Sequence, residues 1–138
     1  VGVSADANAQ VIVDNSDPGF SAPIGWGTGS GGSQFGPDYR FAFTGQGIGP
    51  AVWKARLPAG IYKISAWWVS GANRPPAAPY IISHAGGSTT VLKNQQTGGG
   101  AWQTLGAFSL NAGVNQVQLS TWTSSGYVVI ADAIRWQP

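Results

Sequence analysis

The sequence predicts an all-β fold: a β-sandwich or jelly roll of antiparallel strands with an extended N-terminal strand. Short runs of alternating apolar and polar residues recur along the chain, and Gly, Pro and Asn separate them. Apolar residues at helical spacing are nearly absent. With 138 residues, the chain is long enough for one domain with a proper core and short for two.

The N-terminal strand is expected to be unusually long. Apolar residues alternate with small or polar ones from the first residue to Val13, and the outermost five are Val1, Val3, Ala5, Ala7 and Ala9. Thirteen residues at about 3.3 Å each would span roughly 43 Å, longer than most strands. The apolar side is narrow and suits a groove. We therefore predict an N-terminal extension over 1–10, acting as a donor strand, before a domain over 11–138.

The remaining strands follow from the same alternation and from the turn residues between them. They are expected near 11–14, 39–43, 50–57, 61–69, 79–84, 88–93, 102–110, 114–122 and 127–136. A Gly-Ser stretch over 25–36 is predicted to be a long loop. In the strand over 61–69, the apolar face consists of Tyr62, Ile64, Ala66 and Trp68.

The last strand places an acid on an apolar face. Asp132 shares that face with Val128, Ile130, Ile134 and Trp136. An unpartnered buried carboxylate is costly, so Asp132 is expected to meet Arg40, Asn15 or a bound cation.

Composition excludes several classes of function. Charged residues are 9% of the chain, the net charge is +2 and the basic residues are scattered, so no nucleic-acid partner is expected. No apolar run is long enough for a membrane span. The lack of Cys excludes disulfides and thiolate metal sites. Abundant Gly and seven Trp suggest a secreted, extracellular module at a cell surface or in a matrix.

Several blocks of sequence together resemble a known family. They are residues 13–20 (VDNSDPGF), 38–40 (DYR), 66–68 (AWW), 78–80 (APY), 84–87 (HAGG), 94–96 (NQQ), Trp102 with 105–106 (LG), and 131–136 (ADAIRW). In this order they resemble the golvesin and xanthan-lyase C-terminal domain, a β-sandwich similar to carbohydrate-binding modules. The resemblance covers about residues 11–138 and leaves 1–10 outside. It implies a secreted, non-catalytic accessory module, often appended to polysaccharide- or peptidoglycan-active enzymes.

The residues themselves argue against an enzyme. The chain has no Glu, and glycoside hydrolysis normally needs two carboxylates flanking the bond. His84 is the sole His, and no Gly-x-Ser-x-Gly motif accompanies it. The stretch over 27–32 matches G-x-G-x-x-G, but it follows no expected strand and opens no helix. No catalytic residue is therefore predicted.

Two interpretations compete for the acids near the first and last strands. Oxygen ligands from Asp14, Asn15, Asp17 and Asp132 could hold a structural Ca²⁺. Alternatively, Asp17 organises a network of Asx turns, and Asp132 pairs with Arg40. The second interpretation is preferred, so no cofactor is expected and calcium is the alternative.

The aromatic residues also allow two interpretations. A sugar-stacking platform could use Trp26, Trp67, Tyr80, Trp102 and Trp122, with hydrogen bonds from Arg74, His84, Asn94 and Gln95. Large aromatic residues equally fill sandwich cores, which accounts for Trp53, Trp68 and Trp136. For Trp67 and Trp102 the sequence does not separate these roles. Exposed aromatics would serve subunit contacts as well as sugar binding.

Two functional hypotheses follow. The first is a secreted structural subunit whose N-terminal strand inserts beside an open edge of the next copy. Such donor-strand complementation does not close on itself, so it would give a head-to-tail homopolymer, an extracellular filament or matrix fibre. The alternative is a carbohydrate-binding module for a cell-surface or matrix polysaccharide.

Overall fold

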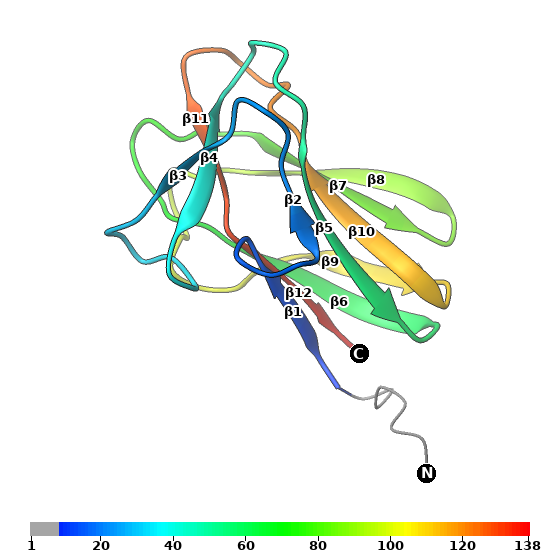
Figure 1. Ribbon diagram of the computed structural model, residues 1–138. Coiled ribbons are helices and arrows are strands. Elements are labelled where there is room, and N and C mark those ends of the chain that lie inside the picture. The colour runs from blue at the N-terminus through cyan, green and yellow to red at the C-terminus, as the bar shows by residue number, and fades with distance from the viewer. Residues whose placement is uncertain (1–8) are drawn as a thin grey trace.

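The computed structural model describes residues 9–138, which form twelve strands and no helix (Figure 1). In chain order the strands are β1 (Val11–Asp14), β2 (Phe20–Ser21), β3 (Gly27–Gly29), β4 (Tyr39–Phe43), β5 (Ala51–Leu57), β6 (Gly60–Trp67), β7 (Ala78–His84), β8 (Gly87–Lys93), β9 (Gln103–Leu110), β10 (Gly113–Leu119), β11 (Val128–Ala131) and β12 (Ala133–Gln137). Residues 9–138 thus contain no helix that could cross a membrane.

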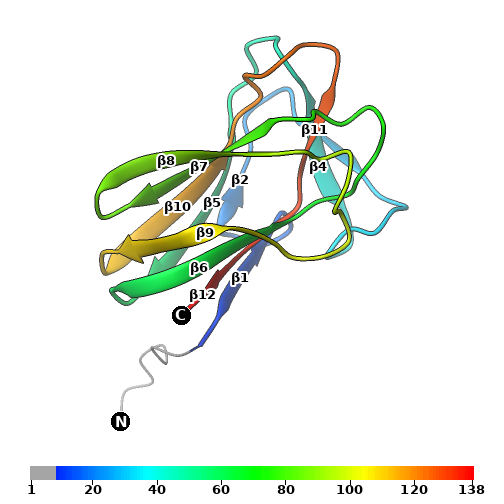
Figure 2. The ribbon, with the colours of Figure 1, turned by 180° about the vertical axis from the view of Figure 1, so that it is seen from behind.

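The strands form three antiparallel sheets. A four-stranded sheet has the order β1-β12-β6-β9, and a five-stranded sheet has the order β2-β5-β10-β7-β8. These two sheets face one another, and the three-stranded sheet β11-β4-β3 lies at one end of the sandwich (Figures 1 and 2). The predicted all-β sandwich is confirmed.

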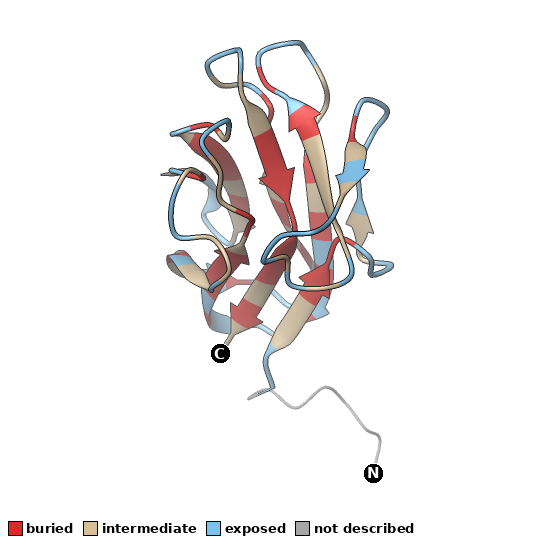
Figure 3. Cartoon of the chain, turned by 90° about the vertical axis from the view of Figure 1, so that its left-hand side faces the viewer, coloured by how far each residue is buried: buried red, intermediate tan, exposed pale blue. Residues whose placement is uncertain are grey.

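The core lies between the two larger sheets, where buried residues gather in Figure 3. Trp53 is fully buried, and its ring lies 6.4 Å from that of Tyr80, which in turn lies 6.3 Å from Trp68. The predicted apolar face of the strand expected over 61–69 is confirmed, because its four members are at most 2% exposed: Tyr62, Ile64 and Ala66 on β6, and Trp68 immediately after it. Large rings therefore fill the sandwich, as the alternation within the strands requires.

Some strand predictions were wrong in their limits. The loop expected over 25–36 contains β3, and β2 was not predicted at all. The strand expected over 114–122 ends at Leu119. The strand expected over 127–136 is two strands in different sheets, because the chain crosses from the three-stranded to the four-stranded sheet at Asp132. The carbonyl of Asp132 accepts a hydrogen bond from Trp53 Nε1 at 3.2 Å, which satisfies the backbone at this crossing.

The N-terminal strand begins at Val11 in the structure. Ala9 and Gln10 are exposed and lie outside any strand, so the single strand predicted from residue 1 to Val13 does not continue through them. The other proposed assembly residues, Val1, Val3, Ala5 and Ala7, lie outside the described residues.

Candidate functional site

A groove of about 320 Å³ lies on the three-stranded sheet. Successive side chains of β4 point to opposite faces of the sheet. Ala42 therefore lies in the core, and the rings of Tyr39, Phe41 and Phe43 lie on the opposite face. The lining residues are Tyr39, Phe41, Phe43, Asn73, Arg74, Val128 and Ile130. Phe43 is 53% exposed, whereas Ile130 is fully buried at the base. The groove therefore has an apolar floor with a row of aromatic rings along one strand.

Two glycines of β3 make room for these rings. Gly27 pairs with Phe41 and Gly29 with Tyr39 in the antiparallel register. A Cβ atom at Gly27 would lie 2.6 Å from the Phe41 ring, and one at Gly29 would lie 2.7 Å from the Tyr39 ring. The rings thus lean over the bare backbone of the neighbouring strand, which keeps this face free of other side chains.

Arg74 supplies the charge of the groove. Its guanidinium carbon lies 5.9 Å from the centroid of the Tyr39 ring, and its Nε and Nη1 atoms donate to Val69 O at 3.1 Å and to Asn73 Oδ1 at 2.6 Å. Within residues 9–138 the Nη2 atom forms no hydrogen bond. No acidic side chain is among the lining residues, so this half-buried cation faces the groove without a counter-charge.

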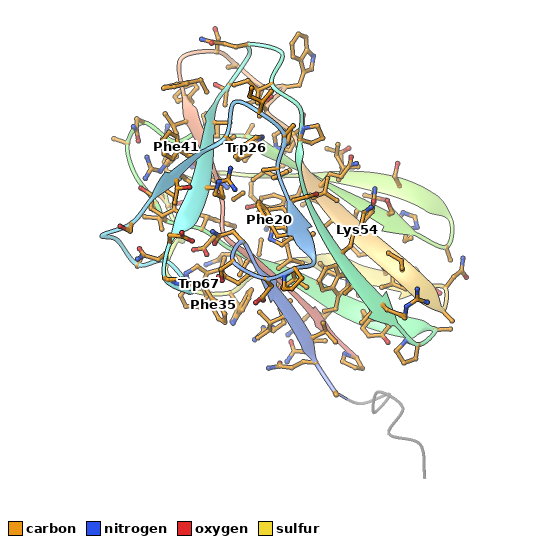
Figure 4. All side chains as sticks on the ribbon, in the orientation of Figure 1. Phe20, Trp26, Phe35, Phe41, Lys54 and Trp67 are labelled. Atoms are coloured by element: carbon orange, nitrogen blue, oxygen red, sulfur yellow. The ribbon has the colours of Figure 1, made fainter. Side chains whose placement is uncertain are left out.

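A second aromatic cluster lies away from this groove, at the start of β9 and the end of β6. It consists of Phe35, Trp67 and Trp102, whose ring centroids are 5.2–5.4 Å apart (Figure 4 labels the first two). Trp67 Nε1 donates to Ser33 O at 2.8 Å, and the Arg135 guanidinium carbon lies 4.7 Å from the Trp102 ring centroid. These contacts pin the loop over 30–38 to the four-stranded sheet and cover part of both indoles.

The other residues of the predicted sugar platform do not come together. Trp26, Tyr80 and Gln95 are 7%, 1% and 0% exposed, so assigning them to a sugar-binding surface was wrong. Tyr80 lies on the inward face of β7, and Trp26 Nε1 donates to Gly49 O at 2.8 Å.

Two further members of the predicted set are accessible but occupied by local contacts. His84 contacts Thr89 Oγ1 at 2.8 Å and stacks on Phe108, where β7 meets β9. Asn94 Oδ1 accepts a hydrogen bond from Gln96 N at 3.0 Å. Neither residue lines the aromatic groove.

The acids near the first and last strands do form a corner. Asp14, Asn15 and Asp132 are at most 8% exposed, and each has one side-chain Oδ1 atom without a hydrogen-bond partner. Asp17 Oδ2 instead accepts from Asp14 N at 2.8 Å, and Asp14 Oδ2 accepts from Ser16 N at 3.3 Å, so among the described residues the Asx turn forms at Asp14 and not at Asp17 as expected. No group of three or more His, Cys, Asp or Glu side chains suited to a metal ion occurs among residues 9–138.

The expected pairing of Asp132 with Arg40 was wrong. Arg40 donates to the carbonyls of Trp26 and Gly27 at 3.0 Å, and Asp132 Oδ2 accepts from Phe35 N at 2.9 Å. Burial raises the pKa of Asp132 to about 8; the Phe35 hydrogen bond opposes this shift, and Asp14 adds to it. Two ionised carboxylates can only accept, so Asp132 and Asp14 bond to one another only when one holds a proton.

Sequence reasoning missed the groove itself. The strand over 39–43 was predicted, but its aromatic residues at every second position were not used as a site signal. Aromatic residues at i, i+2 and i+4 share one face of a strand. The Gly-Thr-Gly of β3 was the second available signal, because glycines opposite large rings leave them room to lie over the neighbouring backbone.

Comparison with known proteins identifies relatives with the same architecture. Residues 11–138 match the model of the golvesin C-terminal domain. A xanthan lyase of Bacillus sp. (strain GL1) is 32% identical over 134 residues, which is 91% of this chain and 14% of that protein. The structure of a Paenibacillus xanthan lyase superposes with a TM-score of 0.88 at 30% identity, over 94% of this chain and 13% of that one.

A family 35 carbohydrate-binding module from Clostridium thermocellum has the same fold. It superposes with a TM-score of 0.70 at 17% identity, and the match covers 93% of this chain and 98% of that module. The fold match thus spans nearly the full length of that module, whereas this chain spans only a small part of the length of either lyase. It belongs to the golvesin C-terminal domain family.

Proposed function

We propose that this chain is a secreted, non-catalytic module that binds a polysaccharide in the aromatic groove on the three-stranded sheet. The observation that carries this proposal is the row of Tyr39, Phe41 and Phe43 beside Arg74 in a groove of about 320 Å³. Concave sites lined by aromatic rings, with a few polar groups to fix orientation, are typical of ligand-binding sites.

The chemistry of the groove suits a sugar chain. A pyranose ring has apolar C–H faces that pack on aromatic rings, and its hydroxyl groups hydrogen-bond to a guanidinium or an amide. Arg74 and Asn73 provide those polar groups at the edge of the aromatic row. The relation to xanthan lyases and the likeness to a carbohydrate-binding module support the same class of ligand.

The Phe35–Trp67–Trp102 cluster is the weaker candidate surface. Trp67 packs edge-on against Phe35 and Trp102, the Phe35 and Trp102 rings are tilted toward one another, and the Arg135 guanidinium lies over the Trp102 ring. A stacking platform needs a free ring face. We therefore assign the cluster to holding the loop over 30–38 and the groove to sugar binding.

Affinity electrophoresis in gels that contain xanthan, glucomannan, xylan or pectin tests the proposal. At least one polysaccharide should retard the parent chain, and Phe43→Ala should weaken that binding roughly tenfold, because an aromatic contact contributes about 0.5–1.5 kcal/mol beyond the area it buries. Leu92→Ala is the control, since Leu92 is 60% exposed on the distant strand β8. Equal retardation of both variants, or no retardation of the parent in any gel, would contradict the proposal.

Assembly into a filament is a second candidate, favoured by one observation. Strand β8 is an edge of the five-stranded sheet, pairs in unbroken register with β7, and contains no proline and one charged residue, Lys93. Natural edge strands are usually blocked by charges, prolines or bulges. We propose β8 as the edge that would accept residues 1–10 of a second copy.

Apolar and polar residues alternate over residues 1–10, so two neighbouring substitutions provide a matched test of assembly. Ala7→Asp would place an unpaired charge on the inserted face, whereas Asn8→Asp lies on the opposite face. Negative-stain microscopy should show polymers of the parent and of Asn8→Asp only. Equal polymer yield from both variants, or no polymer from the parent, rejects donor-strand assembly.

A further inference from the structure

We infer that the groove continues beyond Phe43 to the loop that carries Trp122, so that the site holds an internal stretch of a linear polysaccharide rather than a single sugar or a chain end. This inference rests on the proposed function and adds to it a class of ligand and a second subsite.

Trp122 is the unusual feature of the loop between β10 and β11. It is 74% exposed, whereas the other six tryptophans are buried or half-buried. Its Nε1 atom forms no hydrogen bond within residues 9–138. An indole this exposed to water contributes little to the packing of the fold. Large exposed apolar surfaces typically mark binding sites.

A depression lies directly beside this ring. Its volume is about 350 Å³, and it is lined by Gly45, Trp122, Thr123 and Ser125. Like the aromatic groove, it thus combines an aromatic ring with polar groups, here two hydroxyls. The apolar C–H face of a sugar unit would pack on the indole ring, and the hydroxyl groups of the sugar would hydrogen-bond to the side-chain hydroxyls.

The depression continues the line of β4. Immediately after Phe43, Thr44 N donates to Tyr127 O at 3.0 Å, and Gly45 N donates to Thr121 O at 2.9 Å. The loops β4–β5 and β10–β11 accordingly lie side by side at the end of the molecule (Figures 1 and 2). The path from the aromatic row to Trp122 thus runs along one continuous piece of hydrogen-bonded backbone.

Glycine at position 45 is what allows the two loops to touch. Its φ of 69° lies in the left-handed region, and a Cβ atom there would lie 2.8 Å from Ser125 Cβ. Two side-chain hydrogen bonds also tie the loop that carries Trp122 to neighbouring segments: Thr44 Oγ1 donates to Ser124 O at 2.7 Å, and Thr123 Oγ1 donates to Ala77 O at 3.0 Å. The second subsite is therefore held in place relative to the groove.

The length of the combined surface decides the class of ligand. From Tyr39 to Phe43 strand β4 advances four residues, or roughly 13 Å at about 3.3 Å per residue, and the depression beside Trp122 begins at Gly45 in the turn that follows. The aromatic row and the depression together are longer than one sugar ring, so linked sugar units can occupy them in succession. A surface that reads one terminal sugar would instead be a short, closed pocket.

The test uses the polysaccharide that the parent chain retains in the electrophoresis panel, cut into a disaccharide, a tetrasaccharide and a hexasaccharide. Isothermal titration should give rising affinity from disaccharide to hexasaccharide. Trp122→Ala should weaken hexasaccharide binding roughly tenfold and leave disaccharide binding unchanged, because one stacking contact is lost at the far subsite. Ile24→Ala is the control, since Ile24 is 98% exposed and lines neither depression.

Trp122 fluorescence supplies a second readout. The difference between the parent and Trp122→Ala spectra isolates the most exposed indole, and hexasaccharide should protect it from acrylamide quenching while disaccharide does not. Sedimentation velocity of both proteins checks whether Trp122 instead joins two copies of the chain.

The outcomes separate the two proposals. If Trp122→Ala binds hexasaccharide as tightly as the parent, or if disaccharide and hexasaccharide bind equally, the extended site is wrong while the groove stands. A parent dimer that Trp122→Ala dissolves would make the loop a subunit contact and also overturn the inference. If no polysaccharide binds the parent, the proposed function itself is rejected, and the extended site with it.

Discussion

The side chain of Gln95 bonds to both backbone polar groups of Ile130. Ile130 N donates to Gln95 Oε1, and Gln95 Nε2 donates to Ile130 O, each at 2.9 Å. Gln95 Nε2 also donates to Tyr80 Oη at 3.0 Å. Strand β11 pairs with β4 on one side only, so this amide takes the place of a missing neighbouring strand. It ties the floor of the groove to the aromatic core of the sandwich.

Replacing Gln95 with Met should lower the free energy of unfolding by about 2–5 kcal/mol, because both backbone groups of Ile130 would remain buried without partners. Gln95→Glu keeps an acceptor for Ile130 N but loses the donor to Ile130 O, so it should also destabilise. Urea unfolding followed by tryptophan fluorescence measures both variants.

The control for this experiment is Gln116→Met. Gln116 is half-buried on β10 and forms no side-chain hydrogen bond within residues 9–138, so its replacement should change stability by about 0.5 kcal/mol at most. A Gln95→Met variant as stable as Gln116→Met would show that the Ile130 backbone finds other partners.

Gly29→Ala should weaken polysaccharide binding without unfolding the protein. The added Cβ would lie 2.7 Å from the Tyr39 ring, so the ring must move from its place over β3, whereas the backbone of Gly29 is not in the left-handed region. Gly60→Ala is a matched control, because its Cβ would meet its nearest neighbour, Tyr62, at an ordinary 3.6 Å. Titration with the retained polysaccharide should show a several-fold loss for Gly29→Ala alone; equal affinity for both would show that the position of Tyr39 is irrelevant to binding.

The fold was predictable from the sequence where apolar and polar side chains alternate over several residues. Alternation located the strands from β4 to β10 to within a few residues and identified the buried face of β6. The two strands that were missed have little to show in sequence: β2 has two residues, and β3 is Gly-Thr-Gly. Period-two patterning needs several side chains on each face, and neither strand provides them.

The site was less predictable because exposure depends on tertiary contacts. Gln95 lies between Asn94 and Gln96, and nothing local to these three polar residues indicates that only the middle one is fully buried. Likewise, the partner of Asp132 proved to be a backbone N–H from Phe35, 97 residues away, and not the cation expected from charge. Such pairings arise only when loops pack on the sandwich.

Stability should decrease as the pH rises from about 4 toward about 8. Burial raises the pKa of Asp132 from its usual value of 3.8 to about 8, so between these values the folded state holds a proton that the unfolded state has released. The stabilisation that comes from protonated Asp132 is fully present below the pKa of Asp132 in the unfolded chain, and it is lost as the pH rises through its pKa in the folded protein. Thermal unfolding in buffer with a chelator, from pH 5 to pH 9, measures it.

Asp132→Asn separates this titration from others. Asparagine cannot ionise, yet its oxygen can accept from Phe35 N and its amide can donate to Asp14. The variant should be more stable than the parent at pH 9 and should show a flatter pH profile. Parent stability that instead rises with pH in the chelator buffer would contradict this prediction. A rise that appears only when calcium replaces the chelator would indicate that a bound cation favours both charged carboxylates, and it would revive the calcium interpretation of this corner.

Trp102→Ala distinguishes the two aromatic surfaces. The Trp102 ring contacts Phe35 and Trp67 at 5.2 and 5.4 Å and lies under Arg135, so its removal takes away one wall of the cluster that holds the loop over 30–38. Loss of a half-buried aromatic ring should cost about 1–3 kcal/mol, and Trp102→Phe should recover much of it. Since the groove lies on another sheet, the folded variant should keep the parent's polysaccharide affinity. Measuring binding well below the variant's unfolding temperature avoids confusing the two effects. A folded Trp102→Ala that no longer binds, alongside a Phe43→Ala that binds normally, would move the sugar site from the groove to the Trp102 cluster.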